Sequence, residues 1–305
     1  MHKVENAITM RINTKNRRMK LLNALRSDLN KTLLNIGFAG AVLLTFLLCF
    51  TAPAYTDNNT MKSYSVFEAL FSLDRKFIRS NIDFASARLA RLGMNGYVTL
   101  FLPIIVAFPF MVSFCAERNN GNIRFVIART GKLRYYISKF VSCFLCGGLA
   151  VLIGISLYMC AMYMLFPPLS SYNANEQILE TYRGSGELWE NIKYCISSFL
   201  NGAIATMPAF FLSSFCKNPY IITCIPFMLT YVWQTIMTKL INKAFESYNI
   251  KLIERLEPFN PCTAGLMFDT RSSVAVRSVI FNCSYVFVFL AGFIAIMSKT
   301  RDKGT

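Results

Sequence analysis

The sequence predicts an all-α integral membrane protein with six transmembrane helices, an N-terminal interfacial amphipathic helix, and both termini in the cytoplasm. Hydrophobic residues make up 54% of the 305, charged residues only 16%, and the mean hydropathy is positive. Soluble domains carry roughly 25% charged residues. The apolar residues also fall in blocks long enough to cross a bilayer. The net charge of +16 lies in segments that flank these blocks, which argues against a nucleic-acid-binding surface.

Residues 1–32 are expected to form a cytoplasmic N-terminus that contains the interfacial helix. Four leucines recur there at helical spacing, at positions 21, 22, 25 and 29, among eight basic residues. A basic amphipathic helix just before a span should lie in the lipid headgroup layer, although it could instead be the solvated start of the first span. No apolar run precedes Leu33, so we expect no cleaved signal peptide.

The transmembrane domain is expected at residues 33–298, followed by a cytoplasmic tail at 299–305. The predicted spans are residues 33–52, 96–115, 137–166, 191–215, 220–240 and 274–297. The loops 54–95, 167–190 and 242–272 are expected outside the cell. Loop 54–95 should contain short surface helices at 66–71 and 85–92. The short apolar run 264–268 could dip into the membrane as a re-entrant piece.

Four prolines interrupt the predicted spans and are candidate hinges for alternating access: Pro103, Pro109, Pro208 and Pro226. A proline within a helix removes one backbone hydrogen bond and crowds the preceding turn, so each should kink or locally unwind its span. Tolerated helix irregularity is the simpler alternative.

The distribution of charge gives the orientation. On the side that holds both termini, the predicted segments carry 18 of the 32 Lys and Arg residues but only four of the 16 acids, a net charge of +14. Everything else has a net charge of +2. The positive-inside rule therefore places both termini, a basic loop at 116–136 and a short turn at 216–219 in the cytoplasm.

Several kinds of chemistry have no motif in this chain. It contains no phosphate-binding G-x-x-x-x-G-K-[ST] loop, no H-E-x-x-H and no G-x-S-x-G, and its one histidine is His2. Cys143 and Cys146 have the spacing of a zinc or redox pair, but they lie in an apolar run without a second pair, so we interpret them as small core residues. We therefore expect no catalytic residue, no metal site and no enzyme activity, and any energy source should lie in another protein.

The basic loop carries the most informative pattern. It begins Glu117-Arg118-x-x-Gly121, continues through an amphipathic turn to Arg129-Thr130-Gly131, and leads through Arg134 to Lys139 at the start of the third span. This pattern resembles the type-2 exporter permeases of the ATP-binding-cassette (ABC) transporters. Their loop has an E-R-x-x-G start, a short helix, a P-x-S-R-like turn and a lysine that leads the next span. This chain departs from that pattern at Thr130-Gly131, where the family has a proline, and also at Asn122 and Ser138.

The resemblance implies a half-transporter whose cytoplasmic loop docks as a coupling helix onto a separate ABC ATPase subunit. It also implies a second permease copy or a sister permease, contact with membrane lipids, ATP and Mg²⁺ bound by the ATPase, and location in a bacterial cell membrane. The cargo would be hydrophobic or amphipathic, such as a peptide (a bacteriocin, for example), a drug or a lipid. The implied coupling residues are Glu117, Arg118, Gly121, Arg124, Arg129, Lys132, Arg134 and Lys139, with Lys217 and Asn218 in the second cytoplasmic loop.

Two alternatives remain open. The basic residues of the loop could merely obey the positive-inside rule and contact lipid headgroups. The chain could also be a non-transport adaptor or regulatory protein whose basic loops bind a cytosolic partner or anionic lipid. Glu117 is harder to explain in these ways, because the positive-inside rule does not call for an acid.

Overall fold

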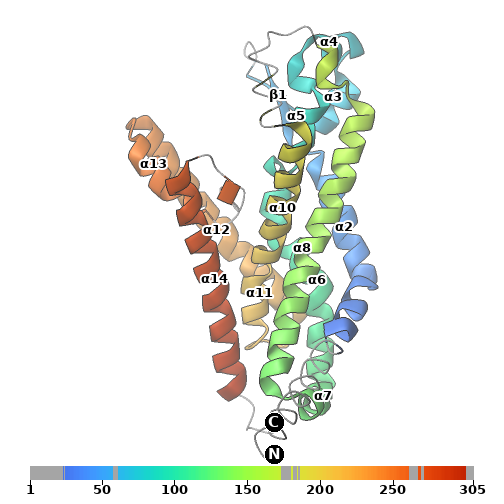
Figure 1. Cartoon of the computed structure of the whole chain (residues 1–305), viewed down its shortest axis with the longest axis vertical. Coiled ribbons are helices and arrows are strands. Elements are labelled where there is room, and N and C mark those ends of the chain that lie inside the picture. The colour runs from blue at the N-terminus through green and yellow to red at the C-terminus, as the bar shows by residue number, and fades with distance from the viewer. Residues whose placement is uncertain are drawn as a thin grey trace, which may run out of the picture.

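The computed structural model describes residues 23, 25–57, 61–172, 180, 184, 186–260, 267–268 and 271–299. Long helices dominate this part of the chain and run along one common direction (Figure 1). They are α2 (Ile36–Cys49), α6 (Tyr97–Asn119), α8 (Lys132–Leu165), α10 (Glu187–Ala205), α11 (Met207–Leu212), α12 (Pro219–Glu246) and α14 (Ser272–Lys299).

Five helical segments among the described residues are long and apolar enough to cross a membrane, and a bent pair brings the number to six at most. The α10–α11 pair counts as one of the five. This agrees with the predicted all-α membrane protein. The helices begin or end a few residues away from the predicted spans. For example, α8 begins at Lys132, where the prediction put residue 137.

The first predicted span differs most from expectation, because residues 33–52 are not one straight helix. A helix at Leu25–Leu33 meets α2 at an angle of 60°. Asn35 explains the break: its side-chain oxygen accepts the Gly37 N–H at 3.2 Å and caps the start of α2. Such a side chain offers the backbone an alternative to continuing the helix. Most of the predicted interfacial helix at 1–32 lies outside the described residues.

The candidate hinge prolines have different surroundings. Helix α6 continues through Pro103 and Pro109, and α12 continues through Pro226, so none of the three unwinds its span. Pro208, in contrast, lies in the first turn of α11, next to the short break at Thr206 that separates α10 from α11.

The tightest helix packing is between α8 and α10, where glycines let the two backbones approach closely. A Cβ added to Gly202 would lie 2.7 Å from the carbonyl oxygen of Gly147, and one added to Gly147 would lie 2.2 Å from a methyl carbon of Thr206. Small residues at such crossings are typical of helix packing in membranes. Cys143 and Cys146 lie fully buried in this part of α8 as free thiols, as expected for core residues.

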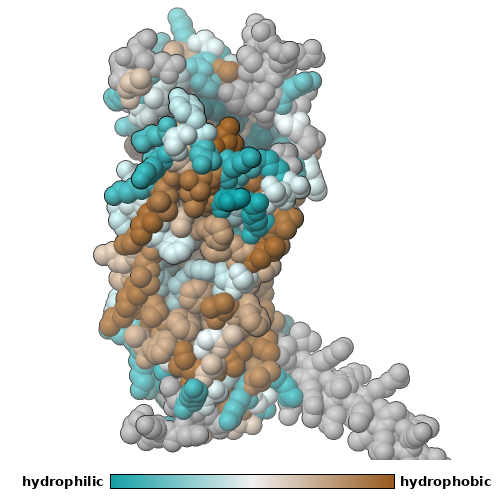
Figure 2. All heavy atoms as spheres, turned by 90° about the vertical axis from the view of Figure 1, so that its left-hand side faces the viewer, coloured by the Kyte–Doolittle hydropathy of each residue, from teal (hydrophilic) through white to brown (hydrophobic). Residues whose placement is uncertain are grey.

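Helices α12 and α14 lie at the edge of the bundle (Figure 1). Along the most apolar stretch of α14, only 11% of the residues are buried. Along the corresponding stretch of α6, 61% are buried. Figure 2 shows this face of the molecule: an apolar band crosses it, and hydrophilic residues gather above and below the band. A surface of this kind is suited to lipid.

A small cap covers the end of the bundle opposite to the α6–α8 connection (Figure 1). It contains the antiparallel strands β1 (Pro53–Thr56) and β2 (Ser63–Ser65), the helices α3 (Val66–Ser72), α4 (Arg75–Ser80) and α5 (Ser86–Ala90), and the short turns η1 (Ile82–Phe84) and η2 (Gly93–Asn95). Helices α3 and α5 fall on the two segments where short helices were predicted. The two strands were not predicted from the sequence.

The rest of the described chain forms short elements between the long helices. They are α7 (Asn122–Thr130), η3 (Leu169–Ser171), α13 (Ile250–Leu256) and η4 (Glu257–Phe259). The predicted re-entrant run at 264–268 lies largely outside the described residues, since only 267–268 are included.

Candidate functional site

The connection between α6 and α8 is itself a short helix, α7, which is bounded by two glycines. Gly121 has φ +70° and Gly131 has φ +86°, a region that L side chains rarely adopt. Nothing lies within 4 Å of a Cβ built on either residue, so backbone conformation, not space, calls for glycine. The chain therefore leaves α6 sharply, forms nine residues of helix, and turns again into α8.

One side of α7 packs on the bundle and the other is exposed. Ile123 and Ile127, one turn apart, pack into the apolar cluster beneath. On the outer side the Phe125 ring is 74% exposed, and Leu133, just beyond the turn, is 61% exposed. We call the exposed residues of this region the α7 surface: Arg124, Phe125, Val126, Arg129, Lys132 and Leu133. It combines apolar and basic side chains and contains no acid.

Arg134 has a different position from the other predicted coupling arginines. It is half-buried, and its guanidinium donates to the carbonyl oxygen of Thr130 at 3.4 Å. It therefore helps to close the turn between α7 and α8 more than it adds to the exposed surface.

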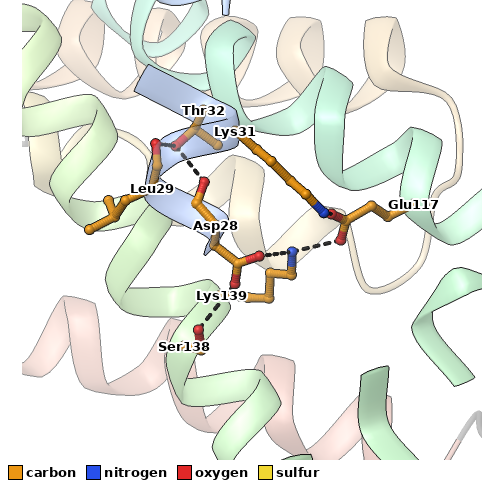
Figure 3. A network of polar contacts seen from close by, with 7 residues as sticks. All are labelled: Asp28, Leu29, Lys31, Thr32, Glu117, Ser138 and Lys139. Carbon is orange, nitrogen blue, oxygen red and sulfur yellow. Dashed lines mark hydrogen bonds and ion pairs between the residues drawn. The ribbon is translucent and has the colours of Figure 1, made fainter. Parts of the chain in front are cut away.

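Beneath α7, a buried lysine joins three segments of the chain (Figure 3). Lys139 of α8 is 4% exposed, and its Nζ lies 2.7 Å from Asp28 Oδ1 and 2.6 Å from Glu117 Oε2. Ser138 Oγ lies 3.1 Å from the second oxygen of Asp28, and Lys31 Nζ lies 3.3 Å from the second oxygen of Glu117. We call these five residues the Lys139 network. It ties the helix Leu25–Leu33 and the end of α6 to the start of α8.

The charges of the Lys139 network balance, because two lysines face two carboxylates. The Lys139 ammonium also lies 5.5 Å from the centre of the Tyr135 ring, a contact that favours a cation. A buried ammonium is costly unless it is paired and hydrogen-bonded. Here both acids serve that purpose, which accounts for Glu117 and for the acid Asp28 in an otherwise basic segment.

The next residue of α6, Arg118, fixes a fourth segment. Its guanidinium donates to the carbonyl oxygens of Ser213, of Ser214 at 3.0 Å and of Cys216 at 3.1 Å. These carbonyl groups lie just after the end of α11, in the turn that leads into α12. Glu117 and Arg118 therefore connect the end of α6 to the helix Leu25–Leu33, to α8 and to the α11–α12 turn.

The predicted residues of the second loop have unequal positions. Asn218 caps α12, because its side-chain oxygen accepts the Tyr220 N–H at 3.0 Å. Lys217 is exposed beside it. The Arg118 contacts bring this turn and the α6–α7–α8 connection together at one end of the molecule.

No sequence pattern singled out the partners in these contacts, which are Asp28, Lys31, Ser138, Ser213, Ser214 and Cys216. Asp28 gave a usable signal, since it is an acid in a strongly basic stretch beside a span. The carbonyl groups gave none, because any residue type supplies a backbone oxygen.

No protein-family model matches this chain, and no curated protein matches it significantly.

Proposed function

We propose that this chain is the membrane-spanning permease subunit of an ATP-driven exporter of the ABC class, with energy supplied by a separate ATPase subunit. The observation that carries the proposal is the α7 surface. It presents apolar and basic side chains on a helix that two glycine turns hold apart from the long helices on either side.

The mounting of α7 supports a role in transmitting force. A push on α7 would act on α6 through the two-residue turn Asn120–Gly121 and on α8 through the single residue Gly131. At the base of these helices, the Lys139 network and Arg118 hold the helix Leu25–Leu33 and the α11–α12 turn to the same point. Displacement of α7 would therefore be passed to the whole end of the bundle instead of being absorbed by a loose loop.

The chemistry of the α7 surface defines the partner. Phe125 and Leu133 need an apolar groove, and Arg124, Arg129 and Lys132 need an acidic rim around it. The proposed partner is an ATPase subunit with such a groove, and the working unit contains two permeases and two ATPases. The proposed cargo is hydrophobic or amphipathic, namely a peptide, a drug or a lipid.

The test is co-purification with the ATPase subunit in mild detergent. In the variant with Arg124→Glu and Arg129→Glu, like charges would meet at the rim, so we expect loss of the ATPase from the purified complex and loss of transport. The control is the variant with Lys243→Glu and Lys251→Glu, which reverses two exposed charges near α13, at the opposite end of the molecule (Figure 1).

The outcome separates the two candidate classes. If the wild-type chain retains no ATPase, or if the α7 variant keeps full transport, the permease proposal is wrong. Retention of a different cytosolic protein, lost in the α7 variant, would support the adaptor alternative.

A further inference from the structure

Helices α3 and α4 form an exposed surface that the proposed function does not use. On α3, Phe67 is 57% exposed and Phe71 is 78% exposed, with ring centres 4.9 Å apart. Two residues further on, α4 exposes Arg75, Lys76 and Arg79. We call these five residues the α3–α4 surface.

The fold holds this surface in a fixed orientation. The N–H groups of Val66 and Phe67 donate to the carbonyl oxygens of Ala52 and Phe50, at 2.9 and 3.0 Å, so α3 begins directly on the end of α2. On the inner side of α4, the Tyr172 hydroxyl donates to the carbonyl oxygen of Ile78 at 3.0 Å. Ring contacts add to this, because Phe77 packs on Tyr55 and Phe84. With its inner side occupied in this way, α4 directs its three basic residues outward.

Among the described residues, the basic residues of α4 form no salt bridge. Glu68, the nearest acid on α3, is engaged in a capping box: its carboxylate accepts the Ser65 N–H at 2.9 Å. Asp74, at the start of α4, is the other acid between residues 61 and 80. The surface therefore combines two exposed aromatic rings with excess positive charge.

The position of the surface points to lipid. Leu43, Leu44 and Leu47 are exposed along α2, which together with the bent helix Leu25–Leu33 is long and apolar enough to cross a membrane. The bonds from Val66 and Phe67 place the start of α3 at the level where α2 ends, so the exposed rings of Phe67 and Phe71 lie close to the border of the apolar surface. Basic side chains just beyond an apolar border lie at the depth of lipid phosphates.

We propose that the α3–α4 surface binds the headgroups of anionic phospholipids: Phe67 and Phe71 insert among the acyl chains, and Arg75, Lys76 and Arg79 hold the phosphates. A second copy of this chain fits less well, because the same surface on both copies would bring like charges together. The inference does not depend on the proposed function. It concerns the end of the molecule opposite α7 (Figure 1), where the positive-inside rule does not account for basic residues.

The test measures lipid selectivity of the full-length protein reconstituted in phosphatidylcholine vesicles. Spin-labelled phosphatidylglycerol and spin-labelled phosphatidylcholine are added in parallel, and electron paramagnetic resonance gives the fraction of each that is immobilised on the protein. We expect a clear preference of the wild-type protein for phosphatidylglycerol. Neutralisation of Arg75, Lys76 and Arg79 to Gln should weaken that preference by about tenfold or more, since each basic residue near the surface adds roughly a factor of five.

The matched control neutralises three exposed bases near the same end of the molecule: Lys243 at the end of α12, and Lys251 and Arg255 on α13. It should keep the preference. A preference that falls equally in both triple variants, or that survives in the α4 variant, would overturn the proposal. The variant with Phe67→Ser and Phe71→Ser should lower the immobilised fraction of both lipids. Unchanged fractions would refute the insertion of the rings.

Discussion

Among the charged residues near α7, Lys139 should be the one whose substitution destabilises the protein most. The side chain is buried between two carboxylates, so its removal would leave Asp28 and Glu117 facing each other without a cation. Removal of one partner from a buried pair costs far more than the pair itself contributes, because the remaining charge is uncompensated. This position should therefore determine the stability of the region.

Lys139→Met should lower the free energy of unfolding by about 3–5 kcal/mol. Titration of the purified protein with a denaturing detergent in mixed micelles measures this change. The control is Lys31→Met, which removes a lysine whose side chain is 58% exposed and should cost only about 0–1 kcal/mol. Similar losses in the two variants would contradict the central role of Lys139.

Arg118→Lys should also destabilise the protein, although the charge is kept. A guanidinium offers five donors in a fixed fork, whereas a lysine has a single ammonium and cannot serve the carbonyl oxygens of Ser213, Ser214 and Cys216 together. Hydrogen bonds from charged groups contribute roughly 1.5–3 kcal/mol each, so we expect a loss of at least about 1.5 kcal/mol. Arg124→Lys, on the exposed α7 surface, should change stability by less than about 0.5 kcal/mol. Equal stability of the two variants in the same titration would show that the carbonyl contacts contribute little.

At the scale of elements, the two glycine turns define α7. Gly131 has φ +86° and ψ +147°, a conformation that a Cβ strains even where space is open. We expect Gly131→Ala to cost about 1–3 kcal/mol and to reduce the proposed transport, because the angle between α7 and α8 would change. Gly40→Ala is the control: Gly40 lies inside α2 with nothing within 4 Å of an added Cβ, and alanine favours helix. A variant at Gly131 as stable and as active as the control would contradict a strained turn.

The α8–α10 crossing depends on the absence of a side chain. Gly202→Ala would place a Cβ 2.7 Å from the Gly147 carbonyl oxygen, which is backbone and cannot rotate away. Overpacking of this kind typically costs about 1–3 kcal/mol. The unfolding titration should show this loss for Gly202→Ala but not for Gly40→Ala. No loss at Gly202 would mean that the two helices can separate without cost.

At the scale of the whole molecule, the cap and α7 lie at opposite ends of the bundle (Figure 1). The charge bias along the sequence predicts that α7 lies in the cytoplasm and the cap outside. Ser80 on α4 and Ala128 on α7 are exposed positions at these two ends. In a variant with all ten native cysteines replaced, a membrane-impermeant maleimide should label Ser80→Cys on intact cells. It should label Ala128→Cys only after permeabilisation. The reverse pattern, or labelling of both on intact cells, would contradict the predicted orientation.

Much of the helical architecture follows from the sequence, because long apolar runs between charged segments can satisfy their backbone hydrogen bonds in a membrane only as helices or closed barrels. The helix at 122–130 and the glycines that border it could also be predicted from the sequence, because Gly121 and Gly131 frame an amphipathic, basic stretch. The break at Asn35 could not be predicted from the sequence, since a single asparagine in an apolar run can either cap a helix or lie within one.

What the sequence by itself determined is the membrane class, the places where helices occur and the segment most worth testing, because these depend on local composition, period and charge bias. Only the tertiary structure decided which groups meet. Asp28 and Lys139 are 111 residues apart in the chain, and Arg118 bonds carbonyls almost as distant. Neither contact leaves a pattern in neighbouring residues, because a buried lysine can pair with any nearby acid and a guanidinium can donate to any backbone carbonyl oxygen. The sequence shows Glu117 and Arg118 only as two members of a motif. The folded bundle shows that their contacts join the segments at one end of the molecule.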